Sequence, residues 1–78
     1  MPFTSEMMEE IKILTLYNLD STQEGIKVHS SAKPEAIAAT KRLFDKGLVS
    51  QEDGGYLTIL GITSAEYAQN LQQILRDE

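Results

Sequence analysis

The chain has 78 residues, of which 41% are hydrophobic and 24% charged, a composition typical of one soluble globular domain rather than of a disordered segment. It contains no cysteine, which excludes disulfide bonds and thiolate metal sites. The formal net charge of -5 disfavours binding to nucleic acids and to anionic membranes when it is taken alone. We treat residues 1–78 as a single domain, and a core this small would gain stability from a partner subunit.

The first ten residues, MPFTSEMMEE, are acidic and lack the basic and apolar regions of a secretion signal. No apolar run approaches the roughly 18 residues of a membrane span. We therefore expect a cytoplasmic protein that does not contact membranes.

The charge is unevenly distributed. Residues 1–24 carry -4, residues 25–46 carry +3 and residues 47–78 carry -4. The five basic residues of the middle third are Lys27, Lys33, Lys41, Arg42 and Lys46. This concentration indicates either a basic patch for a ligand or an ordinary solvated helix face, and both interpretations stay open.

A first helix is predicted from a cap at Thr4 to about residue 18, because acidic residues fill its opening turns, where the helix dipole favours negative charge. Its apolar residues have helical spacing and are Met7, Met8, Ile11, Leu14, Leu16 and Tyr17. The alternation of Ile11, Ile13 and Thr15 leaves a strand as the alternative. Core packing explains so apolar a helix, and a dimer interface is the functional alternative.

The next segment, STQE at residues 21–24, has capping-box spacing and predicts a short helix from residue 22 to about residue 28. Gly25, Ile26 and Val28 are poor helix formers, so a short strand over residues 26–29 is the alternative. Residues 29–32 would form the turn that follows.

A second long helix is predicted over residues 34–46. Six residues share one half of the helical wheel and should be buried: Ala36, Ile37, Ala39, Thr40, Leu43 and Phe44. Lys41, Arg42 and Lys46 fall on the other half, together with two acidic residues. Pro34 suits the first helical turn, and Gly47 suits the left-handed residue that ends a helix.

A hairpin and a last helix complete the prediction. Residues 48–49 and 56–58 are strand-like, and the Asp53-Gly54-Gly55 turn between them can supply positive φ angles. The last helix begins at Thr58 or at Thr63, since residues 63–66 repeat the capping-box spacing. Its apolar stripe consists of Leu60, Tyr67, Leu71 and Ile74, joined by Ala68 and Leu75. Such a stripe packs in the core or against a two-fold mate.

This order of elements predicts a mainly α winged helix-turn-helix domain with a small β-hairpin. The run FDKGLV at residues 44–49, followed by GYLTILG at residues 55–61, resembles that of many bacterial winged-helix regulators. The whole chain, with NLDSTQEGIKVH at residues 18–29 and RLFDKGL at residues 42–48, is similar to a family of short uncharacterised bacterial proteins. Members of that family have been labelled DNA-binding proteins or transcriptional regulators, so the resemblance implies a label and no mechanism.

No enzyme motif is present. His29 is the only imidazole, and neither a G-x-S-x-G motif, a P-loop nor a dinucleotide fingerprint accompanies it. The carboxylate pairs at residues 9–10 and 52–53 lack the spacing of a calcium loop. We interpret His29 as structural and expect no catalysis, cofactor or metal.

Two functional hypotheses remain. We favour a DNA-binding transcriptional regulator that uses the helix over residues 34–46 as its recognition helix on double-stranded DNA. Its contacts to phosphates or base edges would come from Lys27, Lys33, Lys41, Arg42 and Lys46. The alternative is a winged-helix protein-interaction module that forms a homodimer through its first and last helices. The net charge and the acidic hairpin tip at residues 51–53, where a DNA-binding wing commonly carries Arg or Lys, favour this alternative.

Overall fold

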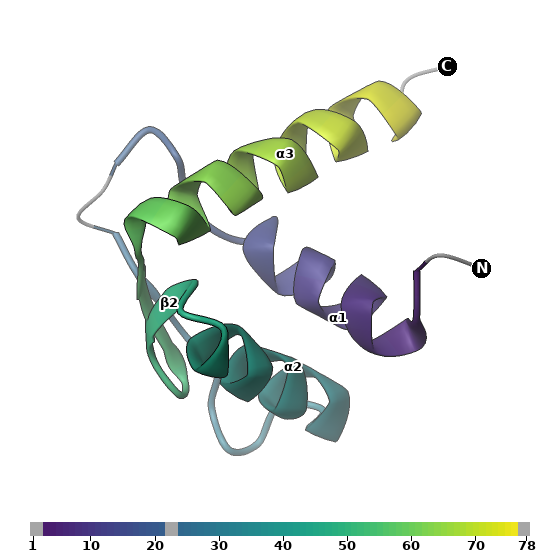
Figure 1. The fold of residues 1–78 in the computed structure, drawn as a ribbon. Coiled ribbons are helices and arrows are strands. Elements are labelled where there is room, and N and C mark those ends of the chain that lie inside the picture. The colour runs from purple at the N-terminus through teal and green to yellow at the C-terminus, as the bar shows by residue number, and fades with distance from the viewer. Residues whose placement is uncertain (1–2, 22–23, 77–78) are drawn as a thin grey trace.

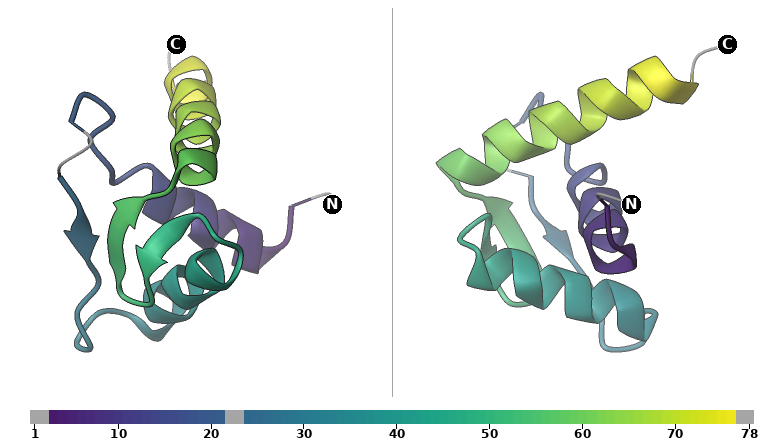
Figure 2. Two further views of the ribbon diagram at one scale, coloured as in Figure 1. Left: turned by 60° about the vertical axis from the view of Figure 1, so that its left-hand side comes forward. Right: turned by 45° about the vertical axis from the view of Figure 1, so that its right-hand side comes forward.

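Three helices and a three-stranded antiparallel sheet make up the fold (Figure 1). The computed structural model describes residues 3–21 and 24–76. The elements are α1 (Ser5–Leu14), β1 (Ile26–Lys27), α2 (Pro34–Asp45), β2 (Val49–Gln51), β3 (Gly54–Leu57) and α3 (Ile59–Arg76). Helix α1 lies between α2 and α3 and packs on both, and the sheet closes one end of this stack (Figure 2).

Helix α1 begins as predicted and ends early. The Thr4 hydroxyl accepts a hydrogen bond from the Met7 amide at 3.0 Å, which confirms the cap. The helix ends at Leu14, because the Thr15 hydroxyl bonds the Lys12 carbonyl at 2.6 Å and the chain turns away from the helix axis. The predicted core packing is wrong for Met7, Met8 and Leu16, which are exposed. The buried residues are Ile13, Leu14 and Tyr17.

The short helix predicted over residues 22–28 is wrong in the part that the structure describes, which excludes residues 22–23. Residues 26–27 instead form β1, which pairs with β3 so that Ile26 lies opposite Gly55. The Glu24 carboxylate accepts from the Asn18 side chain at 3.1 Å. In a capping box, it would bond the backbone of residue 21. The strand alternative holds for residues 26–27, and no helix lies between α1 and α2 among the described residues.

The second long helix and the hairpin are confirmed. Pro34 occupies the first turn of α2, and Gly47 follows the helix with a φ of 81°. Strands β2 and β3 pair with Val49 opposite Leu57. Gly54 and Gly55 have the predicted positive φ angles, 123° and 73°. The predicted position of the turn is wrong, because both glycines belong to β3 and the turn consists of residues 52–53. The sheet order β1-β3-β2 places the hairpin strand β3 in the middle.

The buried face of α2 is narrower than predicted. Ala39, Thr40 and Leu43 are buried, whereas Ile37 and Phe44 are 38% and 36% exposed. The expectation that these two large side chains lie in the core was therefore wrong.

Helix α3 begins directly after Thr58, the first of the two predicted starts. The Thr58 hydroxyl accepts from the Gly61 amide at 3.0 Å and donates to the Gly47 carbonyl at 2.6 Å. Thr63 lies inside the helix and caps nothing. Three small residues, Gly61, Ala65 and Ala68, form the buried face of α3. At Gly61 the helix backbone rests on Leu48, since an added Cβ would lie 1.9 Å from the Leu48 carbonyl oxygen.

We expect Gly61→Ala to destabilise the fold by about 1–3 kcal/mol, because the obstructing atom belongs to the backbone and the helix must move away from β2. This loss outweighs the roughly 1 kcal/mol that Ala gains over Gly inside a helix. Urea unfolding measures the change, with Thr63→Ala as an exposed control in the same helix. Equal midpoints for Gly61→Ala and the unmodified chain would contradict the close contact.

Candidate functional site

Two of the five predicted DNA-binding residues, Arg42 and Lys46, form ion pairs with a buried carboxylate. Glu10 of α1 is only 7% exposed. One of its carboxylate oxygens accepts from Arg42 Nε at 2.7 Å, and the other accepts from Lys46 Nζ at 2.5 Å. Arg42 also donates to the Glu6 carbonyl at 3.2 Å. The α2 face that was expected to be open to phosphates therefore turns part of its charge toward α1.

The pKa of Glu10 reflects this arrangement. Burial alone would raise the pKa of its carboxyl group, but the hydrogen bonds and positive charges of Lys46 and Arg42 outweigh burial and hold the pKa below its ordinary value of 4.5. Ionised Glu10 thus stabilises the folded state above pH 4.5. This contribution is lost as the pH falls through the lowered pKa.

The other three predicted residues are accessible. Lys41 lies 3.9 Å from Asp45 in an exposed pair, which contributes little to stability. Lys27 and Lys33 are exposed, and neither forms a salt bridge within the part of the chain that the structure describes. The structure therefore divides the predicted set into a pair that binds Glu10 and three accessible lysines, of which Lys41 forms an exposed ion pair.

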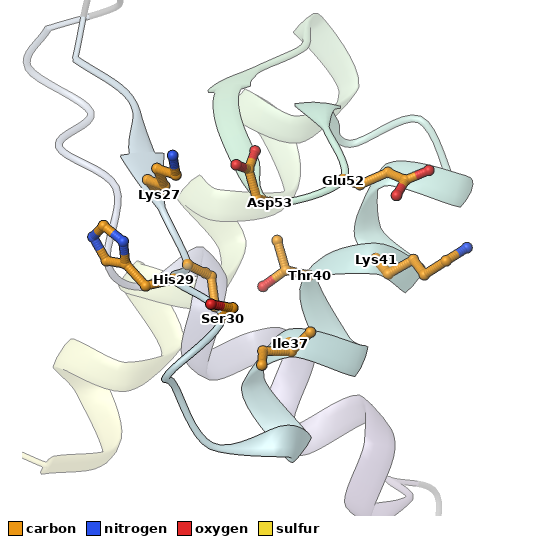
Figure 3. A pocket seen from close by; sticks show the side chains of 9 residues that line it. Lys27, His29, Ser30, Ile37, Thr40, Lys41, Glu52 and Asp53 are labelled. Carbon is orange, nitrogen blue, oxygen red and sulfur yellow. The ribbon is translucent and has the colours of Figure 1, made fainter.

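A hollow of about 450 Å³ lies between the β1–α2 turn, α2 and the hairpin tip (Figure 3). Lys27 and Lys41 both line it, together with acidic residues of the hairpin. Figure 3 shows that Lys41 and Glu52 extend outward on one side and that His29 points away on the other. Polar groups that converge on one point characterise a small-molecule site, and this hollow lacks them. We assign no ligand to it.

Tyr17 is one of the buried core residues. Burial, aided by the negative charge of Asp53, raises the pKa of the Tyr17 hydroxyl to about 12, so it is neutral at physiological pH. The hydroxyl has no hydrogen-bond partner among the described residues. The Gln69 side chain of α3 donates to the Tyr17 carbonyl at 2.7 Å and to the Leu14 carbonyl at 3.3 Å, which ties α3 to the end of α1.

An apolar groove of about 540 Å³ lies between α1 and the C-terminal half of α3. The two helices diverge toward the chain ends (Figures 1 and 2). The apolar lining of the groove consists of Phe3, Met8, Ile11, Ala68, Leu71 and Leu75. We call it the α1/α3 groove.

The predicted apolar stripe of α3 borders this groove and faces solvent. Five of its members are between 44% and 72% exposed: Leu60, Tyr67, Leu71, Ile74 and Leu75. Its interpretation as core is therefore wrong for the single chain, and only Ala68 is buried. The small residues at positions 61, 65 and 68 were the sequence signal for the packed face. Their helical spacing places them on one face of α3, next to the apolar stripe. On this face, the backbone of α3 comes close to the rest of the domain.

Comparison with known protein families assigns the chain to one of them. Residues 1–76 match the model of a family of unknown function, DUF5669. The chain belongs to this family. The match covers nearly the full length, and the family description names neither DNA binding nor a winged helix. No curated protein and no solved structure matches this DUF5669 chain. Within the described residues, none of its helices combines the length and apolar character needed to cross a membrane.

Replacing both Arg42 and Lys46 by Ala should cost about 3 kcal/mol of stability at pH 7, because it leaves the buried Glu10 carboxylate without a counter-charge. Burial then raises the pKa of Glu10 above its ordinary value, so the variant should regain stability as the pH falls toward 5. The unmodified chain should show no such gain from Glu10.

Thermal unfolding between pH 5 and pH 7.5 measures both effects. Lys41→Ala serves as control, since Lys41 belongs to the same helix and forms only an exposed pair. Stability of the double variant equal to that of the control at every pH would contradict a structural role for the pair.

Proposed function

We propose that this DUF5669 protein is a protein-interaction module that takes an apolar α-helix into the α1/α3 groove. The observation that carries the proposal is the orientation of α3. This helix packs on the rest of the domain through small residues, and its large apolar side chains face solvent. Monomeric proteins seldom leave so continuous an apolar surface uncovered.

The spacing of the apolar stripe on α3 suits a helical partner. Tyr67, Leu71 and Ile74 stand at intervals of four and three residues, the pattern by which one helix presents anchors to another, and Leu71 also lines the groove. Burying one such side chain contributes about 1.5–3 kcal/mol. Three or four buried anchors contribute about 5–12 kcal/mol against the roughly 4–15 kcal/mol lost on association, so the groove side chains buried on the other side of the contact must contribute as well.

Electrostatics support the same proposal. The hairpin tip is acidic and exposed at Glu52, and two of the five basic residues are bound to Glu10. A surface for phosphate groups is thereby reduced, whereas the α1/α3 groove is largely apolar and carries no acidic residue in its lining.

A synthetic amphipathic peptide with leucines at four- and three-residue spacing and lysines elsewhere is a suitable probe of the groove. We expect Met8→Glu to weaken its binding by about tenfold, because a carboxylate then lies in an apolar contact. General attraction of the cationic peptide to an acidic chain predicts the opposite sign, since Met8→Glu adds negative charge.

The measurement is a titration of dye-labelled protein at nanomolar concentration, where self-association is negligible. Gln73→Glu adds the same charge on the exposed face of α3 away from the groove and serves as the matched control. Binding that increases equally in both variants would refute the proposal.

A second candidate is DNA binding by a smaller basic set. The observation that favours it is that Lys27, Lys33 and Lys41 stay free of close ion pairs and belong to the segment that leads through α2 into the hairpin. In this proposal, Arg42 and Lys46 fix α2, and only the three lysines contact phosphates on double-stranded DNA.

For this candidate, changing Lys27, Lys33 and Lys41 together to Ala should lower the logarithmic salt slope of duplex binding by about 0.9 per lost contact, or nearly 3 in all. Folding should be unaffected, because all three side chains are exposed. Fluorescence anisotropy across a salt series measures the slope, with thermal melting as the folding control. Undetectable binding of the unmodified chain at low salt would remove DNA from consideration.

A further inference from the structure

We propose that the occupant of the α1/α3 groove is α3 of a second copy of this chain, so that the protein is a two-fold symmetric homodimer. This inference rests on the proposed function and names its partner. Both halves of the contact, the groove and the apolar stripe beside it, belong to the same chain, as a self-complementary interface requires.

The exposed area has the size of a dimer interface. The chain exposes 5583 Å². A compact monomer of this mass, 8.7 kDa, exposes about 4,700 Å². The excess of roughly 850 Å² matches the area of about 800 Å² that each partner contributes to a stable interface of standard size. Residues 70–76 of α3 are all exposed.

The charge pattern of α3 favours a second copy over a charged partner. Residues 67–75 include no charged side chain, in a chain that is 24% charged. Two copies with a net charge of -5 each repel one another over most of their surfaces, and this run is where they can meet without like charges in contact. The charged residues that line the groove, Lys12 and Arg76, are both basic, so a basic partner would gain nothing there.

Helix geometry completes the arrangement. In an antiparallel pair of α3 helices with the two-fold axis near Leu71, Tyr67 of one copy and Leu75 of the partner subunit lie at the same level. Each is four residues from the axis, on the same stripe. Leu71 then lies at the centre of the interface in both copies, where anchor residues contribute most.

Analytical ultracentrifugation at micromolar concentrations tests the dimer. We expect a mass of about twice 8.7 kDa. Leu71→Glu should weaken dimerisation by about 100-fold or more, because the substitution enters the interface twice and removes a buried leucine from each side. Gln73→Glu, with the same change of charge, should leave dimerisation within about threefold of the unmodified chain. Circular dichroism of all three proteins verifies that the fold persists.

A monomer across the micromolar range, or a dimer that Leu71→Glu leaves intact, overturns the inference. The peptide titration separates its failure from that of the proposed function. If the protein is a monomer whose groove still binds the amphipathic peptide in a Met8-dependent manner, the proposed interaction module stands and the homodimer is refuted. If the monomer does not bind the peptide, both proposals are refuted.

Discussion

The buried carboxylate of Glu10 determines how α2 is oriented in the fold. A carboxylate this far from water must be paired, and Arg42 and Lys46 are the residues that pair with it. Helix α2 is thereby rotated so that these two side chains point to α1, and Ile37 and Phe44 turn toward solvent in consequence. The apolar contact left to α2 is small, since it rests on Ala39, Thr40 and Leu43. This network of ion pairs thus determines which side chains of α2 enter the core. It also engages two basic side chains that would otherwise be available to a ligand.

Local chemistry was predictable from the sequence, because the residues that start and stop elements act on their immediate neighbours. The Thr4 cap and Gly47 after α2 have the predicted roles, and Gly54 and Gly55 have the predicted positive φ angles, although they lie in β3 and not in the turn. The secondary structure of residues 26–27 was not predictable in the same way. They form a strand because β3 offers a partner edge where Gly25 allows close approach to Gly55. The pairing of Glu10 with Arg42 spans 32 positions, and no local pattern encodes it.

Helix α3 shows a different limit of sequence reasoning. Periodicity identifies which residues share one face of the helix, but it does not tell which face packs against the rest of the domain. The choice here follows from backbone approach, since the helix rests on the Leu48 carbonyl at Gly61 and only small side chains fit on that strip. Large apolar residues consequently border the α1/α3 groove from outside the core. The groove therefore emerges only from the placement of α3 beside α1.

The two candidate surfaces occupy different parts of the molecule, and this has a consequence for function. Helix α1 separates α3 from α2 (Figure 1), so a dimer formed through α3 leaves Lys27, Lys33 and Lys41 uncovered. Three phosphate contacts alone give weak, salt-sensitive binding. A two-fold dimer would present the same three lysines twice on one particle, and the second set binds at a high effective concentration once the first is engaged. Self-association through α3 would thus be the step on which any useful affinity for an extended polyanion depends, because the charge of a single chain is insufficient.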